Sequence, residues 1–172
     1  MAKWIGIIML LLSGCTSLPD DITPVDNFEL PKYLGTWYEV ARLDHSFERG
    51  MSAVTATYSM REDGGVKVLN RGFIDAEQQW DDAQGKAYFV DGTDVGHLKV
   101  SFFGPFYGAY VVYELDAEYQ YAFITSYSRD YLWFLSRTPT VDEALMARFS
   151  QQAKQMGFAS EQIIWVDQSR NN

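Results

Sequence analysis

Eight short runs of alternating apolar and polar residues follow one another between Thr36 and Ser136, and they constrain the fold more than any other feature of the chain. The runs are rich in β-branched and aromatic residues and are separated by clusters of Gly, Asp and Asn, which is typical of antiparallel strands joined by tight turns. The predicted strands are residues 36–43, 53–60, 66–74, 80–90, 98–103, 108–115, 121–127 and 132–136. Because eight strands in succession can close an up-and-down barrel, we predict an all-β fold of this kind.

A helix and a short final strand are predicted after the barrel. One apolar face at helical spacing is formed by Val141, Leu145, Phe149, Gln152 or Ala153, and Met156. Thr140 and Glu143 match a capping box at the start of this helix, and Gly157 is its expected end. The apolar run at residues 163–166 is predicted to return to the barrel as a ninth strand.

The alternation within each strand predicts which side chains point into the barrel. If Trp37 points inward, Ala41 lies on the same side of its strand. Several inward faces carry small residues such as Gly85, and these leave space inside the barrel that the aromatic neighbours do not fill. Asn70 and Tyr110 are polar and need a partner, which water or a ligand could supply. The residues expected to line a ligand site are Val54, Ala56, Tyr58, Val68, Asn70, Ala87, Phe89, Val100, Phe102, Tyr110, Val112 and Trp133. The alternative is that they pack a dry core.

Charge and cysteine content exclude several classes of protein. The formal net charge is −9, which disfavours nucleic acid as a partner. Cys15 is the single cysteine, so the folded chain holds no internal disulfide. Aromatic residues make up 16% of the chain, a content that suits sheets enclosing something apolar.

The first residues carry an export signal. Lys3 precedes an apolar run that is too short to span a bilayer, and Leu12-Ser13-Gly14-Cys15 follows it. This segment resembles the lipobox of bacterial lipoproteins, which implies cleavage before Cys15 and attachment of a diacylglycerol to its thiol. Thr16 and Ser17 after the cysteine, without aspartate, imply export to the outer membrane, facing the periplasm. The expected organisation is a signal peptide at 1–14, a proline-containing tether at 15–30, a barrel domain at 31–168 and a polar tail at 169–172.

Three motifs then carry a resemblance to a family. Gly35-Thr36-Trp37-Tyr38-Glu39 resembles the Gly-x-Trp-Tyr-Glu signature of lipocalins, and residues 115–119 and 135–139 are similar to their second and third motifs in order. The likeness covers residues 31–167 and is greatest to the lipocalins of bacterial outer membranes. It implies a barrel that binds fatty acids or lysophospholipids, without a cofactor. It also implies a structural role for Gly35, Trp37 and Arg137, with Arg137 lying across the Trp37 indole at the closed end.

Other functions remain open at this point. An enzyme would lack a thiol nucleophile once Cys15 is acylated, and only His45 and His97 could act as bases, in separate contexts. A haem held by either histidine is conceivable, although no metal-binding motif is present. A structural envelope lipoprotein with a filled barrel is the third class, and a barrel that binds another small hydrophobic ligand is also an alternative. The hydrophobic hairpin at residues 102–107 could touch lipid, form a homodimer contact or pack in the core.

Overall fold

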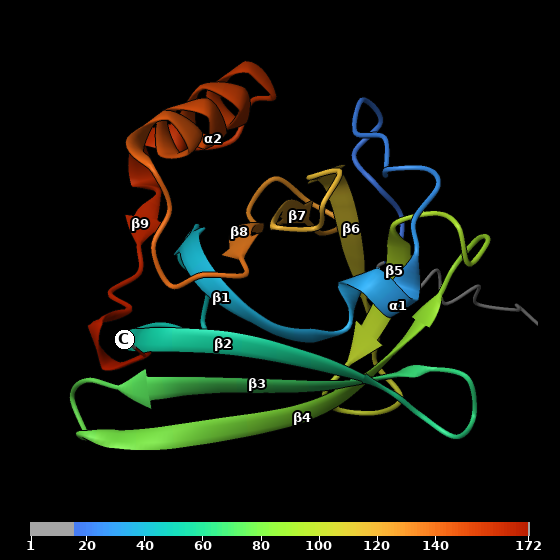
Figure 1. Ribbon diagram of the computed structural model, residues 1–172, viewed down its shortest axis with the longest axis horizontal. Helices are drawn as coiled ribbons and strands as arrows, with labels where there is room; N and C mark the ends of the chain where they lie inside the picture. The colour runs from blue at the N-terminus through green and yellow to red at the C-terminus, as the bar shows by residue number, and fades with distance from the viewer. Residues whose placement is uncertain (1–15, 172) are drawn as a thin grey trace, which may run out of the picture.

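The computed structural model describes residues 16–171, and these form a closed antiparallel β-barrel with one long helix outside it (Figure 1). Each strand pairs with the next in sequence, and β1 pairs with both β2 and β8, which closes the sheet. The strands are β1 (Gly35–Arg42), β2 (Met51–Met60), β3 (Val66–Ile74), β4 (Gln79–Phe89), β5 (His97–Ser101), β6 (Gly108–Leu115), β7 (Tyr121–Thr125) and β8 (Leu132–Ser136). The predicted barrel is confirmed, with β5 and β7 each ending two residues early.

The two ends of the barrel differ. The loops at 61–65, 90–96 and 116–120 lie at the end where β1 begins, and the short helix α1 (Leu30–Tyr33) crosses this closed end. The loops at 43–50, 75–78, 102–107 and 126–131 surround the opposite end, which we call the mouth. Residues 61–65 and 90–96 contain the turns predicted from Asp63-Gly64-Gly65 and Asp91-Gly92.

Helix α2 (Glu143–Gln155) packs on the outside of the barrel, near β1 and β9 (Figure 1). Its buried Phe149 ring lies 4.8 Å from the ring of Phe123 on β7 and 5.1 Å from that of Phe134 on β8, measured between centroids. The 3-10 turn η1 (Ser160–Gln162) leads into β9 (Ile164–Trp165), which pairs with β1, and η2 (Ser169–Asn171) ends the described chain. The predicted helix and ninth strand are confirmed.

The start of α2 differs from the prediction. Asp142 is the N-cap, and its Oδ1 accepts a hydrogen bond of 2.7 Å from the backbone N–H of Leu145. The backbone carbonyl of Thr140 instead accepts from the hydroxyl of Thr138, so the predicted Thr140–Glu143 capping box is wrong. At the other end Gly157 has φ +79°, the left-handed conformation that favours glycine at a helix end, as predicted.

A bulge in β1 changes which residues face inward. Glu39 pairs with Leu135 and Ala41 pairs with Phe134, which leaves Val40 as the extra residue. Val40 and Ala41 therefore both pack outside, in the cluster beneath α2 that contains Phe134 and Phe149. The expectation that Ala41 points inward with Trp37 is wrong, because a single inserted residue reverses the alternation.

The segment before the barrel packs on it at several points. Ile22 is buried in the outer cluster with α2, and Phe28 is buried among the inward-facing residues at the closed end. The backbone N–H of Val25 donates to the carbonyl of Val112 at 2.8 Å. In residues 16–171 no helix has the length and apolar character needed to cross a bilayer. The expected leader and Cys15 lie outside the described residues.

Candidate ligand-binding interior of the barrel

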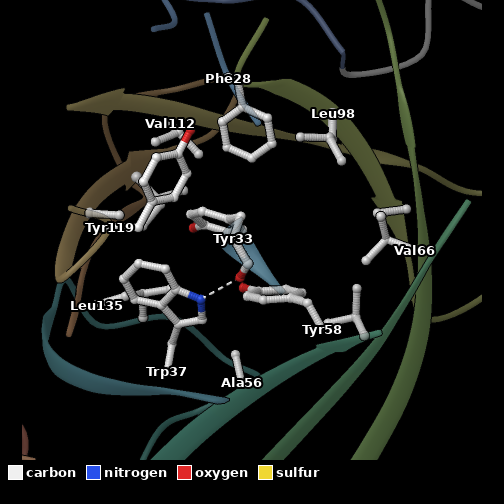
Figure 2. Packing of buried hydrophobic residues seen from close by; sticks show 14 residues of the cluster. Phe28, Tyr33, Trp37, Ala56, Tyr58, Val66, Leu98, Val112, Tyr119 and Leu135 are labelled. Atoms are coloured by element: carbon white, nitrogen blue, oxygen red, sulfur yellow. Dashed lines mark hydrogen bonds between the residues drawn. The ribbon is translucent and has the colours of Figure 1, made fainter. Parts of the chain in front are cut away.

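The inward-facing side chains form one apolar cluster at the centre of the barrel (Figure 2). This cluster contains ten of the twelve residues expected to line a ligand site: Ala56, Tyr58, Val68, Ala87, Phe89, Val100, Phe102, Tyr110, Val112 and Trp133. Asn70 pairs in register with Ala56 on the same inner row. Val54 lies beside Gly72 of β3: a Cβ built on Gly72 would be 3.3 Å from Cγ2 of Val54.

Several of these inner residues keep contact with solvent. Phe89, Val100, Phe102, Tyr110 and Trp133 are only partly buried although they pack against the central cluster, whereas Val112 and Trp37 are fully buried. Ala83, which pairs with Asn70, is exposed on its strand. Apolar side chains that point into a barrel and still reach solvent indicate free space beside them, since a filled core would cover them.

Three tyrosines form a polar cluster inside the barrel, Tyr33 from α1 and Tyr58 and Tyr110 from the wall. The Tyr110 hydroxyl lies 2.7 Å from that of Tyr33 and 2.8 Å from that of Tyr58. The Tyr33 and Tyr58 rings lie at the centre of the cluster (Figure 2). The backbone carbonyl of Tyr33 accepts a hydrogen bond from the indole N–H of Trp37. Burial raises the pKa of all three tyrosines, so the hydroxyls stay protonated. The two hydrogen bonds among the three hydroxyls use two of the three hydroxyl protons, so one hydroxyl proton remains available as a donor.

An unpaired acceptor lies on the same wall. The Oδ1 atom of Asn70 is buried and has no hydrogen-bond partner in the described part of the chain. Asn70 sits one inward position along β3 from Val68, which pairs with Tyr58. A buried amide without a partner is unfavourable by roughly 1–3 kcal/mol. The inner wall therefore offers both an unused donor and an unused acceptor.

Charged residues lie inside the barrel near the mouth, and the sequence reasoning did not select them. Glu39 and Arg42 face inward on either side of the β1 bulge and are 3% and 2% exposed. Arg42 Nη1 donates to Glu39 Oε1 at 2.7 Å, and Nη2 donates to the carbonyls of Glu48 and Met51. Burial and the nearby Glu48 carboxylate raise the pKa of Glu39 well above its ordinary range, against the opposing effect of Arg42.

The loop at residues 43–50 adds His45 and Glu48 to this cluster. His45 Nε2 lies 2.8 Å from Glu48 Oε2, and the Trp133 indole donates to the same oxygen at 3.2 Å. Burial alone would raise the pKa of Glu48, but His45, Trp133 and the charge of Arg42 together lower it. The inward position of Glu39 follows from the alternation that begins at Trp37, whereas that of Arg42 depends on the bulge and has no signal in the sequence.

Aromatic rings lead from the mouth toward the interior. Phe47, 55% exposed, stacks on Tyr131 at an interplanar angle of 18°, and Tyr131 stacks on Trp133 at 20°. The ring of His45 lies 3.9 Å from that of Phe47 between centroids. This row of rings runs from the exposed Phe47 to Trp133, which packs against the inner cluster.

Arg137 covers the closed end. Its guanidinium carbon lies 3.9 Å from the centroid of the Trp37 ring. Its nitrogens donate to the backbone carbonyls of Thr36, Lys32, Leu34 and Tyr119. Gly35, with φ +98°, leaves room for the Arg137 guanidinium, because a Cβ at position 35 would lie only 3.3 Å from Arg137 Nη1. The arrangement closes the barrel opposite the mouth.

The two histidines lie in different parts of the structure. His45 belongs to the mouth cluster, whereas His97 lies at the start of β5 with Nδ1 3.0 Å from Asp91 Oδ2. Among residues 16–171 no group of His, Cys, Asp and Glu is arranged to hold a metal ion. The structure thus brings the predicted apolar lining together but keeps the histidines apart.

Comparison with known proteins gives consistent matches over most of the chain. The model of a family described as "Lipocalin-like domain" matches residues 28–168. A protein of Vibrio cholerae named "Outer membrane lipoprotein Blc" is 56% identical over 168 residues, 97% of this chain and 98% of that protein. The protein of that name from Escherichia coli (strain K12) is 49% identical, covering 92% and 90% of the two chains. The structure of insecticyanin from the tobacco hornworm superposes with a TM-score of 0.71 at 19% identity, covering 90% of this chain and 88% of that one, which shows a shared fold.

Proposed function

The chain belongs to the lipocalin-like family, and from this premise we propose that its barrel binds one fatty acyl lipid, a fatty acid or a lysophospholipid, to store or transport it at the outer membrane. The observation that carries the proposal is the set of apolar inner residues that still reach solvent, among them Phe102, Tyr110 and Trp133. An acyl chain of about 16 carbons would gain on the order of 10 kcal/mol in such a site before the losses of association are subtracted.

Polar groups on the inner wall support a lipid over a pure hydrocarbon. The unused hydroxyl proton of the Tyr33, Tyr58 and Tyr110 cluster can donate to a carbonyl or carboxylate oxygen. The free Asn70 Oδ1 can accept from a hydroxyl of a ligand or from water. Fatty acids and lysophospholipids both carry an oxygen acceptor at the end of an acyl chain, which suits this combination.

The relatives support the proposed location. Two of them, from Vibrio cholerae and Escherichia coli, are named outer membrane lipoproteins and match this chain over nearly its full length. We assign the same location to this protein, with lipid attached at Cys15 and the barrel facing the periplasm. A homodimer stays a prediction.

A binding role is favoured over catalysis. The free space lies beside apolar and tyrosine side chains, and the buried His45 and Glu48 already contact each other, Trp133 and Arg42. A catalytic site would need a nucleophile within reach of a base, and the folded domain offers no cysteine for this once Cys15 is acylated.

Native mass spectrometry of residues 15–172 carrying Cys15→Ser tests the proposal. We expect saturable one-to-one adducts with palmitate and with a lysophosphatidylethanolamine, each displacing the other. Ala56→Phe, which fills inner space, should abolish the adducts, whereas Thr55→Phe on the outer face should keep them. Thermal unfolding checks that both variants are folded. Absence of adducts in the parent chain at high lipid concentration would favour the structural envelope lipoprotein with a filled barrel.

A further inference from the structure

Lysines gather on the outer wall of the barrel at β3, β4 and β5. Lys67 pairs with Lys86 in register, and Lys99 lies on the next strand opposite Tyr88. Their neighbours in sequence, including Val66, Ala87 and Leu98, belong to the inner cluster, so the lysines point outward. We call Lys67, Lys86, Lys99, Tyr88 and Tyr107 the basic wall.

This wall is basic in an acidic protein. The chain has a formal net charge of −9, yet three of the five lysines in residues 16–171 lie here. Within that range no ion pair joins Lys67, Lys86 or Lys99 to a carboxylate. The nearby Asp63 is already held by Arg61 and by the Tyr88 hydroxyl. The three ammonium groups are therefore available to an external anion.

Exposed aromatic residues continue the basic wall toward the mouth. Lys99 Nζ lies 5.2 Å from the centroid of the Tyr107 ring, and the Tyr88 ring lies 6.4 Å from it. Tyr107 belongs to the β5–β6 loop, in which Phe103 and Phe106 are 80% and 77% exposed. Cationic side chains beside exposed aromatic rings suit the boundary between lipid headgroups and acyl chains.

The start of the described chain lies on the same wall. The carbonyl of Thr16 is 3.0 Å from Nε2 of His97 on β5. His97 and Lys99 are two residues apart on the same outer face, a separation of about 7 Å along the strand. Cys15, the proposed site of lipid attachment, is bonded to Thr16. Thr16 thus lies beside the basic wall, and β5 lies on the opposite side of the barrel from α2 (Figure 1).

We propose that the basic wall and the exposed Phe103 and Phe106 form a docking face for anionic lipid headgroups, so that the barrel lies with its β3–β5 side against the membrane. Each lysine close to an anionic surface raises partitioning about fivefold, so three contribute on the order of 100-fold. This orientation places the β5–β6 side of the mouth next to the bilayer. It relies on the lipid at Cys15 but not on which ligand the barrel holds.

The lipidated full chain in vesicles tests this orientation. Because Cys15 is acylated, an introduced cysteine is the one free thiol, and mass spectrometry of the intact protein verifies the acylation. An environment-sensitive fluorophore is attached to the cysteine of Phe106→Cys or, as a control, of Gln151→Cys on the exposed side of α2. The vesicles contain phosphatidylcholine with or without phosphatidylglycerol. We expect a blue shift at position 106 that grows with phosphatidylglycerol, and none at position 151. No shift at 106, or an equal shift at 151, would overturn the proposal.

Charge variants separate headgroup recognition from tethering alone. Lys67→Gln, Lys86→Gln and Lys99→Gln combined should remove the part of the shift that depends on phosphatidylglycerol, as should high salt. Lys154→Gln removes a lysine on α2, away from the basic wall, and this control should leave the fluorescence shift unchanged. A full shift in the triple variant would contradict docking through these lysines. Adduct formation with palmitate, measured on the same variants, should be unchanged, which distinguishes this proposal from the binding function.

Discussion

Arg42 donates from Nη1 to Glu39 Oε1 at 2.7 Å inside the barrel, three residues away on the same strand. Two side chains at this spacing on a regular strand would point to opposite faces. The bulge at Val40 brings both inside, where Arg42 also donates to the carbonyls of Glu48, in the loop at residues 43–50, and of Met51, at the start of β2. The pair therefore connects the barrel wall to the loop at residues 43–50.

Replacing Arg42 with Met should destabilise the fold strongly. Glu39 and Glu48 would lose their cationic neighbour in a buried site, which corresponds to about 3–5 kcal/mol. Urea unfolding measures the difference. The control is Arg49→Met, which breaks the exposed pair with Asp44 and should change stability by less than about 1 kcal/mol. Equal effects of the two substitutions would show that the buried pair has no special role.

The raised pKa of Glu39 predicts a specific pH dependence. Because the folded state holds this proton more tightly than the unfolded state, its contribution to stability is complete below the unfolded pKa of about 4.3 and is lost as pH rises through the folded pKa. Glu39→Gln removes this loss. The variant should therefore gain stability relative to the parent as pH rises from about 4. Denaturant titrations across pH test this, and a constant difference would contradict the raised pKa.

Tyr110→Phe should affect stability and binding together. The substitution removes the hydroxyl that contacts both Tyr33 and Tyr58, which leaves two buried hydroxyls without that partner and lowers stability by about 1–3 kcal/mol. It should also weaken binding of palmitate by roughly a factor of ten if the cluster donates to the ligand. Tyr107→Phe on the outer wall is the matched control and should leave both unchanged. Equal palmitate affinity in the two variants would exclude the tyrosine cluster as a ligand contact.

The cap of α2 can be tested directly. Asp142→Ala should destabilise the fold by about 1 kcal/mol, because the backbone N–H of Leu145 loses its acceptor. Thr140→Ala should have little effect, since the Thr140 side chain does not cap the helix and its backbone carbonyl accepts from the Thr138 hydroxyl. Thermal unfolding of the two variants decides between the observed cap and the one that the sequence favours, and a larger effect of Thr140→Ala would reverse the assignment.

The sequence by itself determined the barrel, its inner face and its covering helix. Alternation with period two marks both the strands and the side that they bury, so Ala56, Tyr58, Val68 and Ala87 could be placed inside from their spacing. The helical spacing of Phe149 and Ala153 likewise identified the face of α2 that packs on the barrel. These features depend on local periods, which a single sequence carries.

Only the tertiary structure decided the mouth cluster and the grouping of the lysines on the basic wall. The bulge that turns Arg42 inward depends on how β1 pairs with β8. Lys67, Lys86 and Lys99 come from three separate strands, and the register of the sheet makes them neighbours. The bulge and the grouping of the lysines follow from contacts between residues far apart in the chain, and no local pattern of residues encodes them.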